Sequence, residues 1–193
     1  MKDPLRVHKF KSFKTTGGRE FFDIKMFDGN FPAEDNVYFA HPINMYNIEL
    51  ERRALGEIAG AFPHYQIINP NDEAHENGYK LYKRVAGNGM KYYFDNVIPF
   101  VKYLVATPLA DGMYTSGVAG EVEHFLDLPS KEPELFKDER RLFRWTKDGG
   151  LEEMLNFPED KVLSIEETRE RLVSPYHNNQ ISLFKGYEFE KRK

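Results

Sequence analysis

The chain has 193 residues and a formal net charge of −4 at pH 7, with 40% hydrophobic and 30% charged residues. This length suits one main domain, and the composition excludes an intrinsically disordered chain. The absence of cysteine excludes disulfide bonds, thiolate zinc sites and a cysteine nucleophile. The acidic pI of about 5.9 argues against a protein that wraps a nucleic acid.

Neither a membrane span nor a secretory signal is evident. Apolar runs such as Val97–Val101 and Tyr103–Ala106 are far shorter than the roughly 20 residues of a membrane-spanning helix. The segment Met1–His8 has positive charge but no apolar stretch behind it. We therefore expect a cytoplasmic protein with no membrane partner.

The first segment with a regular pattern predicts a β-hairpin. Residues 8–27 alternate polar and aromatic positions on both sides of Thr15–Gly18, whose two glycines suit a tight turn. Six Lys or Arg residues and one Asp fall within residues 1–19. A solvated hairpin edge explains this charge better than a nucleic-acid-binding arm, because only Phe10 and Phe13 could stack on bases there.

Strand-like and helix-like segments then alternate. Three short apolar runs predict strands, the first of them buried: Val37–Ala40, Tyr65–Ile68 and Tyr103–Ala106. The segments between them have helical character: Ile48–Phe62, the stretch from Asp72 to Val85, and Met90–Val101 despite Pro99. Such alternation is typical of a parallel sheet with crossover helices. We predict an α/β fold in which helices flank a parallel sheet, a flavodoxin- or Rossmann-like three-layer sandwich.

The C-terminal third has weaker signals. After an irregular, charged stretch, Leu142–Trp145 is a strand candidate. Ser164 and Glu167 have the spacing of a capping box, which predicts a short helix to Leu172. Its charges fit a salt-laced surface helix better than a helix that closes a pocket. The predicted organisation has three parts: an N-terminal hairpin extension over residues 1–35, an α/β core over 36–126, and a C-terminal extension packed on the core over 127–193.

The loops after the first and third strands are the candidate site, because ligands of open parallel sheets bind beyond the carboxyl ends of strands. The third loop, Asp111–Gly117, has glycines that allow close backbone approach, and a helix begins at about Val118 with free N–H groups for anionic oxygens. At ~100° per residue, Glu121 lies at the edge of the apolar face of this helix, whereas Glu123 points away. Spacing alone would leave Glu121 an ordinary helix glutamate.

Three segments together resemble a known family: Tyr38–Ile43, Phe94–Asn96 and Asp111–Glu121. They are similar to the nucleoside 2-deoxyribosyltransferase family and the related 2′-deoxynucleoside 5′-phosphate N-hydrolases, over roughly residues 36–126. Members have Tyr-Leu-Ala-Gly-Pro after the first strand, an Asp in the helix before the third, and Asp-Gly followed by Asp-Ser-Gly-Thr-Ala-Phe-Glu at the third loop. The resemblance implies cleavage or transfer at the N-glycosidic bond of a nucleoside or nucleotide, without a cofactor.

The resemblance also implies residue roles. Glu121 falls on the nucleophile that forms a glycosyl ester, and Asp95 is the candidate acid for the leaving base, with a helix-surface aspartate as the alternative. Tyr38 either orients the nucleophile or packs in the core. The expected substrate contacts come from the two loops, where a turn or cap role is the alternative for each: His41, Pro42, Asn44, Asp111, Thr115, Ser116 and Gly117.

Departures from the family pattern concern the substrate more than the site. His41 stands where the family commonly has Gly, and Thr115 stands in place of the sugar-binding Asp. Glu123 and His124 replace small residues in the helix, and the first loop lacks the Gly-Ser-Ile-Arg of the hydrolases. The base, the sugar, the 5′ group and the choice between hydrolysis and transfer stay open.

A second interpretation is a noncatalytic nucleotide-binding or sensing protein on the same fold. The histidines show no metal-ligand spacing, so we expect no metal. Small α/β enzymes often complete their pockets across a symmetric interface, so we expect a homo-oligomer.

Overall fold

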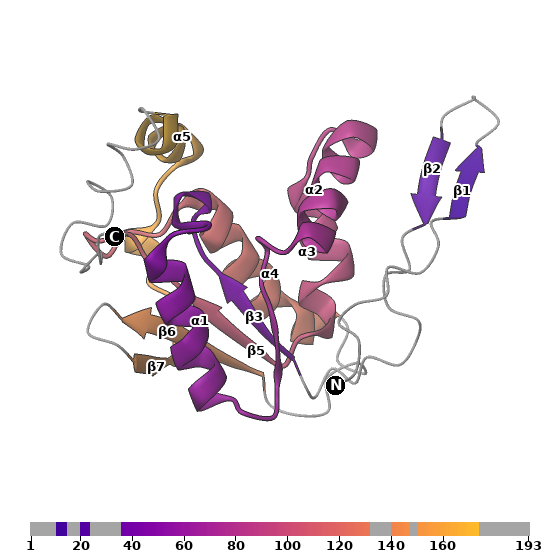
Figure 1. Ribbon diagram of the computed structural model, residues 1–193. Helices are drawn as coiled ribbons and strands as arrows, with labels where there is room; N and C mark the ends of the chain where they lie inside the picture. Colours follow the sequence, from indigo (N-terminus) through magenta and orange to yellow (C-terminus); the bar gives the residue numbers. More distant parts are fainter. Residues whose placement is uncertain (1–10, 15–19, 24–35, 132–139, 147–149, 174–193) are drawn as a thin grey trace.

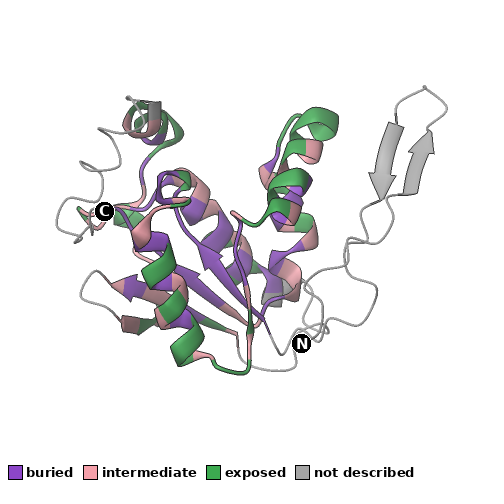
Figure 2. Cartoon of the chain, in the orientation of Figure 1, coloured by how far each residue is buried: buried purple, intermediate pink, exposed green. Residues whose placement is uncertain are grey.

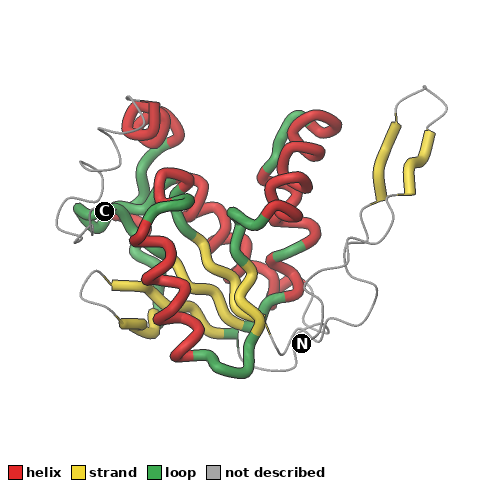
Figure 3. Tube along the Cα trace, viewed as in Figure 1, coloured by secondary structure: helices red, strands yellow, loops and turns green. Residues whose placement is uncertain are grey.

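A five-stranded sheet forms the centre of the molecule. The computed structural model describes residues 11–14, 20–23, 36–131, 140–146 and 150–173. The strands run in the order β4-β3-β5-β6-β7, and helices lie on both sides of them (Figures 1 and 3). The predicted α/β three-layer sandwich is confirmed.

The three predicted strands are parallel neighbours. β3 (Asn36–Ala40) lies between β4 (Gln66–Ile68) and β5 (Tyr103–Ala106), and Tyr38 pairs in register with Ile68 on one side and Leu104 on the other. Every residue of β3 is buried. A strand covered on both faces has an uninterrupted apolar run, which is the pattern that predicted it.

The sheet continues beyond residue 126. β6 (Arg141–Thr146) pairs parallel with β5 and confirms the strand candidate there, whereas β7 (Gly150–Met154) pairs antiparallel with β6 at the edge. β7 was not predicted because its central glutamates interrupt any apolar run. One of them, Glu152, lies opposite Arg144 and forms an ion pair with it. Charges on an edge strand oppose pairing with a further strand.

Four helices form the two outer layers. α1 (Glu49–Ala61) packs on one face, and α2 (Glu73–Ala86), α3 (Met90–Asn96) and α4 (Ser116–Lys131) pack on the other. The central strands β3 and β5 are buried between these layers, while the outward sides of α1 and α2 are exposed (Figure 2). None of the helices in the described residues is both long and apolar enough to span a membrane.

Side-chain alternation along β3 divides the core in two. Val37 and Phe39 pack on the α1 side, whereas Tyr38 and Ala40 pack on the side of α3 and α4. The residue after the strand, His41, continues this alternation, because its ring stacks on Phe39 with the centroids 4.2 Å apart. This division decides which candidate residues meet.

The helix predicted over Met90–Val101 ends earlier. α3 stops at Asn96, and a 3-10 turn, η3 (Ile98–Phe100), follows it. Pro99 lies within this turn, and proline both lacks an amide hydrogen and disfavours helical geometry in the residue before it. The prediction of one continuous helix was therefore wrong at its C-terminal end.

Arg140 satisfies carbonyl groups near this break. Its guanidinium donates to the carbonyl oxygens of Ile98 at 2.7 Å, Val101 at 3.1 Å and Phe125 at 2.6 Å. We predict that Arg140→Met, which keeps an apolar stem but no donor, lowers the free energy of unfolding by about 2–3 kcal/mol because buried carbonyls lose their partners. Urea denaturation measures the loss, and the exposed neighbour Arg141→Gln should cost less than about 0.5 kcal/mol. Equal losses in both variants would contradict this assignment.

The last helix confirms the capping-box prediction. α5 (Ile165–Val173) follows Ser164, whose amide donates to the Glu167 carboxylate at 2.8 Å, while the Glu167 amide donates to Ser164 Oγ at 3.1 Å. The predicted hairpin is also present: β1 (Lys11–Lys14) pairs antiparallel with β2 (Glu20–Asp23). Its predicted turn at Thr15–Gly18 lies outside the described residues.

Candidate active site

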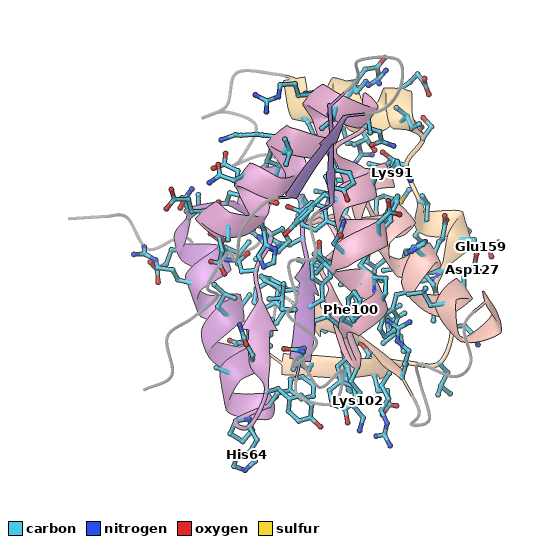
Figure 4. The ribbon with its side chains drawn as sticks, turned by 90° about the vertical axis from the view of Figure 1, so that its right-hand side faces the viewer. His64, Lys91, Phe100, Lys102, Asp127 and Glu159 are labelled. Atoms are coloured by element: carbon cyan, nitrogen blue, oxygen red, sulfur yellow. The ribbon has the colours of Figure 1, made fainter. Side chains whose placement is uncertain are left out.

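The candidate site lies where the strand order reverses. The chain runs from β3 to β4 on one side and returns to β5 on the other side of β3. In sheets of this order, ligands bind where the loops leaving such a strand pair diverge. Here these loops are residues 41–48, with the 3-10 turn η2 (Ile43–Met45), and residues 107–115. His64 and Lys102 mark the opposite, amino edge of the sheet, at the bottom of Figure 4.

A tyrosine and a glutamate far apart in the sequence meet at this position. The Tyr38 hydroxyl on β3 donates a hydrogen bond to Glu121 Oε1 on α4, at 2.7 Å. Their exposed fractions are 0% and 5%, whereas Glu123 is exposed, as the helical geometry predicted. The structure thus brings together two of the three predicted catalytic residues.

Burial dominates the protonation of Glu121. Removal from water raises the pKa of Glu121 to about 8, and the hydrogen bond from Tyr38 offsets part of this effect because it favours the charged form. The carboxyl group is therefore mostly protonated at neutral pH. A strongly raised pKa beside one directed hydrogen bond is more common at functional sites than on surface helices.

Further phenol groups surround this pair. The Tyr93 ring lies 6.0 Å from the Tyr38 ring and 6.2 Å from the Tyr79 ring. Burial is the largest cause of the raised pKa of both Tyr46 and Tyr93, and the charge of Glu121 contributes to each, so both hydroxyl groups lie within its electrostatic reach. Sequence reasoning missed these residues because helix and turn aromatics are ordinarily core residues.

His41 is turned away from Glu121, toward α1. Its Nδ1 lies 2.9 Å from the carbonyl oxygen of Phe39, and its Nε2 lies 3.3 Å from Glu51 Oε1. The Phe39 carbonyl oxygen and the Glu51 carboxylate oxygen are both hydrogen-bond acceptors, one facing each ring nitrogen. His41 therefore links the end of β3 to α1 through Glu51. Both ring nitrogens are engaged, so the predicted donation to a substrate is not available in this arrangement.

Glu51 joins the loops that follow β3 and β4. Besides His41, its carboxylate accepts hydrogen bonds from the side chains of Asn69 at 3.1 Å and Asn71 at 3.0 Å and from the amide of Asn47 at 2.5 Å. Burial alone would raise the pKa of Glu51, but the hydrogen bonds from His41, Asn69 and Asn47 outweigh it and lower the pKa. Asn47 has a left-handed φ of 61°, which this contact helps to hold. The sequence showed Glu51 only as an acid near a helix start.

Asp95, the predicted acid, does not join Glu121. It lies on the exposed side of α3 and forms an ion pair of 3.2 Å with Lys91, one helical turn away (Figure 4 labels Lys91). The alternative interpretation, a helix-surface aspartate, matches this position. The i, i+4 spacing of Lys91 and Asp95 was the sequence signal for it.

The loop after β5 is engaged mainly with the protein itself. Asp111 accepts hydrogen bonds from Arg171 at 2.5 Å and from the Met113 amide at 3.1 Å. Thr115 Oγ1 accepts from the Val118 amide at 3.4 Å and so caps the start of α4. The Ser116 amide donates to Thr168 Oγ1 at 2.9 Å. Of the predicted contacts in this loop, Gly117 has open space where a side chain would begin.

Two buried polar groups at the strand ends lack partners among the described residues. Asn44 Nδ2, in the turn after Pro42, and Thr107 Oγ1, directly after β5, form no hydrogen bond there. Pro42 contributes its carbonyl oxygen to the amide of Met45 at 2.8 Å, as a turn residue does. A buried polar group without a hydrogen-bond partner lowers the stability of the fold. The side chains of Asn44 and Thr107 are therefore candidates to form hydrogen bonds with a ligand.

Comparisons with known proteins give no family assignment. The chain matches no protein-family model, no curated protein and no solved structure. Within the described ranges, no group of three or more His, Cys, Asp or Glu side chains is arranged to hold a metal ion. The site geometry and the sequence resemblance are therefore the two grounds for a functional proposal.

Proposed function

We propose that the protein cleaves or transfers the N-glycosidic bond of a nucleoside or nucleotide, with Glu121 as the nucleophile. The observation that carries the proposal is the buried hydrogen bond of 2.7 Å between Tyr38 and Glu121 at the strand switch. A buried carboxyl group beside the ligand position is what attack on a sugar carbon requires. The family resemblance of the Tyr38 and Glu121 segments supports the same roles.

The proposed reaction has two steps. In the first, the ionised Glu121 attacks C1′ while the bond from C1′ to the base breaks; its electrons leave with the base, which takes up a proton from solvent. In the second, water or the nitrogen of another base attacks C1′ while the bond from C1′ to Glu121 breaks and returns its electrons to the carboxylate; the attacking group releases its proton to solvent. Tyr38 holds Oε1 of Glu121, which leaves Oε2 to attack. Tyr38 is thus the residue that orients the nucleophile.

The raised pKa of Glu121 predicts an alkaline pH profile. Only the ionised carboxylate attacks C1′, so kcat/KM for base release should rise with pH through about 8, instead of reaching its plateau near the ordinary glutamate pKa. Tyr38→Phe removes the hydrogen bond that favours ionisation and should move this midpoint to higher pH. Initial rates between pH 5 and 10 measure both effects. A plateau already reached at pH 6 would contradict the assignment of Glu121.

A noncatalytic nucleotide-binding or sensing protein is the second candidate. The observation in its favour is the same raised pKa, because a glutamic acid that stays protonated donates a hydrogen bond but does not attack carbon. Thr115, at the position of the family's sugar-binding Asp, uses its hydroxyl as a helix cap. This candidate needs the fold and the loops but no chemistry.

A panel of nucleosides and nucleotides distinguishes the two candidates. Each compound is incubated with the protein at pH 7 and pH 9, free base is measured by chromatography, and binding is measured separately by calorimetry. Release of base that depends on the protein supports the enzyme. Binding without release at either pH supports the sensor, and the absence of both binding and release contradicts both candidates.

A further inference from the structure

A segment in the C-terminal part of the chain forms hydrogen bonds to the loop that precedes α4 and Glu121. We call residues 159–172 the strap; it consists of the 3-10 turn η5 (Glu159–Lys161), a short connection and most of α5. Tyr114 and Val162 form a parallel bridge. In it the Tyr114 amide donates to the Lys161 carbonyl at 2.7 Å, and the Leu163 amide donates to the Tyr114 carbonyl at 2.9 Å.

Thr168 is the strap residue that reaches α4 itself. Its Oγ1 accepts the amide of Ser116, the first residue of α4, at 2.9 Å across a sequence separation of 52 residues. Thr168 is 7% exposed although the residues on either side of it, Glu167 and Arg169, are charged and exposed. The first amides of a helix have no partner within the helix, so an acceptor from elsewhere fixes the direction in which the helix begins.

The strap is itself held in place, so its contact with Ser116 is a fixed one. Leu163 is 2% exposed and packs in the core on the α1 side, together with Leu172. The Ser164–Glu167 capping box sets the start of α5, and Arg171 adds an ion pair to Asp111. In Figure 1, α5 lies beyond the arrowhead of β3, at the carboxyl edge of the sheet.

We propose that Thr168 is a positioning residue for Glu121: by accepting the Ser116 amide, it fixes the first turn of α4 from which the glutamate is presented to Tyr38. The nucleophile role of Glu121 rests on the proposed function, but the positioning itself does not. In an α-helix the amide of residue 121 bonds to the carbonyl of residue 117, so the first turn sets the backbone of Glu121. The contact also occupies an amide that a ligand anion would otherwise use.

Two substitutions test the role of Thr168. Thr168→Val keeps the shape but removes the acceptor, Thr168→Ser keeps the hydroxyl, and Glu170→Gln on the exposed side of α5 is the matched control. In Thr168→Val, hydrogen exchange of the Ser116 amide should accelerate at least about tenfold. The carbon-13 titration midpoint of the Glu121 carboxyl should also fall toward the ordinary glutamate value, because burial, the main cause of its raised pKa, is reduced. Thr168→Ser and Glu170→Gln should behave like wild type in both measurements.

The outcomes separate this proposal from the proposed function. If either the Ser116 exchange rate or the Glu121 midpoint of Thr168→Val equals that of wild type, or if Thr168→Ser does not restore both, the positioning role is wrong. If Thr168→Val does not fold, native-state exchange of the wild type decides: the amides of Ser116 and Leu163 should open together as denaturant is added, and independent opening would overturn the proposal. All these measurements are valid even if the wild type releases no base. If it does, Thr168→Val should lower kcat more than it changes KM.

Discussion

Glutamine in place of Glu121 should abolish base release while ligand binding stays largely intact. Glutamine keeps the volume and an oxygen that accepts the Tyr38 hydroxyl, at present 2.7 Å from Glu121 Oε1, but its neutral amide does not attack C1′. The lost interaction belongs to the transition state, so kcat falls and the dissociation constant changes little. We expect a decrease in kcat of at least about a thousandfold, measured as free base in single-turnover reactions, with binding measured by calorimetry.

Glu123→Gln is the matched control on the same helix. Glu123 is exposed, and at ~100° per residue its side chain points well away from that of Glu121, so this substitution should leave both base release and binding unchanged. Wild-type hydrolysis by Glu121→Gln would refute the nucleophile assignment. If the wild-type protein binds a nucleotide at both pH 7 and pH 9 but releases no base, the result would support the sensor instead.

The fold was predictable because each main strand is a short apolar run between turn signals. Val37–Ala40 and Leu104–Ala106 are buried, and strands covered on both faces show an apolar run that is recognisable from the sequence alone. β7 differs, because an edge strand with exposed glutamates has the composition of a loop. The early end of α3 was also readable in principle, since Pro99 marks it.

Within the site, the sequence predicted side-chain orientation only where the repeat of a helix or strand determines which way a side chain points. Glu121 and Glu123 were separated correctly by helical geometry, and the same reasoning applied to β3 would have placed His41 on the face of Phe39, away from Tyr38. The predicted strand ended at Ala40, so the alternation was not carried one residue further to His41. Glu51 and Thr168 act through partners brought close by tertiary structure, and no local spacing indicates such contacts.

Three attachments hold the loops around Tyr38 and Glu121. Glu51 joins the loops after β3 and β4, Thr168 and the strap hold the loop after β5, and Tyr38 links β3 to α4. Preorganised sites depend on such supporting contacts as much as on the residues that meet the ligand. Glu51 has the largest number of donors among them, so its loss should have the largest effect on stability.

Glu51→Gln should lower the free energy of unfolding by about 2–3 kcal/mol, because the buried carboxylate accepts hydrogen bonds from several groups that its replacement cannot all satisfy. The exposed fractions are 3% for Glu51 and 5% for His41, so water does not replace the lost partner. The glutamine side chain has one acceptor oxygen and one NH2 donor in place of the two acceptor oxygens of the carboxylate. Either the Asn47 amide or an asparagine side chain therefore loses its acceptor. Urea denaturation at pH 7 measures the loss, and Glu49→Gln, whose half-exposed carboxylate pairs with Arg52 on the same helix, should cost less than about 0.5 kcal/mol.

The pH dependence and a double substitution identify the cause of this loss. The hydrogen bonds to Glu51 lower its pKa in the folded state, so between the folded and the unfolded pKa the unfolded chain binds more protons and stability falls as the pH falls. The difference in free energy of unfolding between wild type and Glu51→Gln should therefore be largest above the ordinary glutamate pKa. It should shrink as the pH falls through the lowered pKa of Glu51 in the folded protein. His41→Gln combined with Glu51→Gln should cost clearly less than the sum of the single substitutions, because both single substitutions remove the same contact. Additive losses, or a difference that does not change with pH, would show that the 3.3 Å contact between His41 Nε2 and Glu51 Oε1 does not contribute to stability.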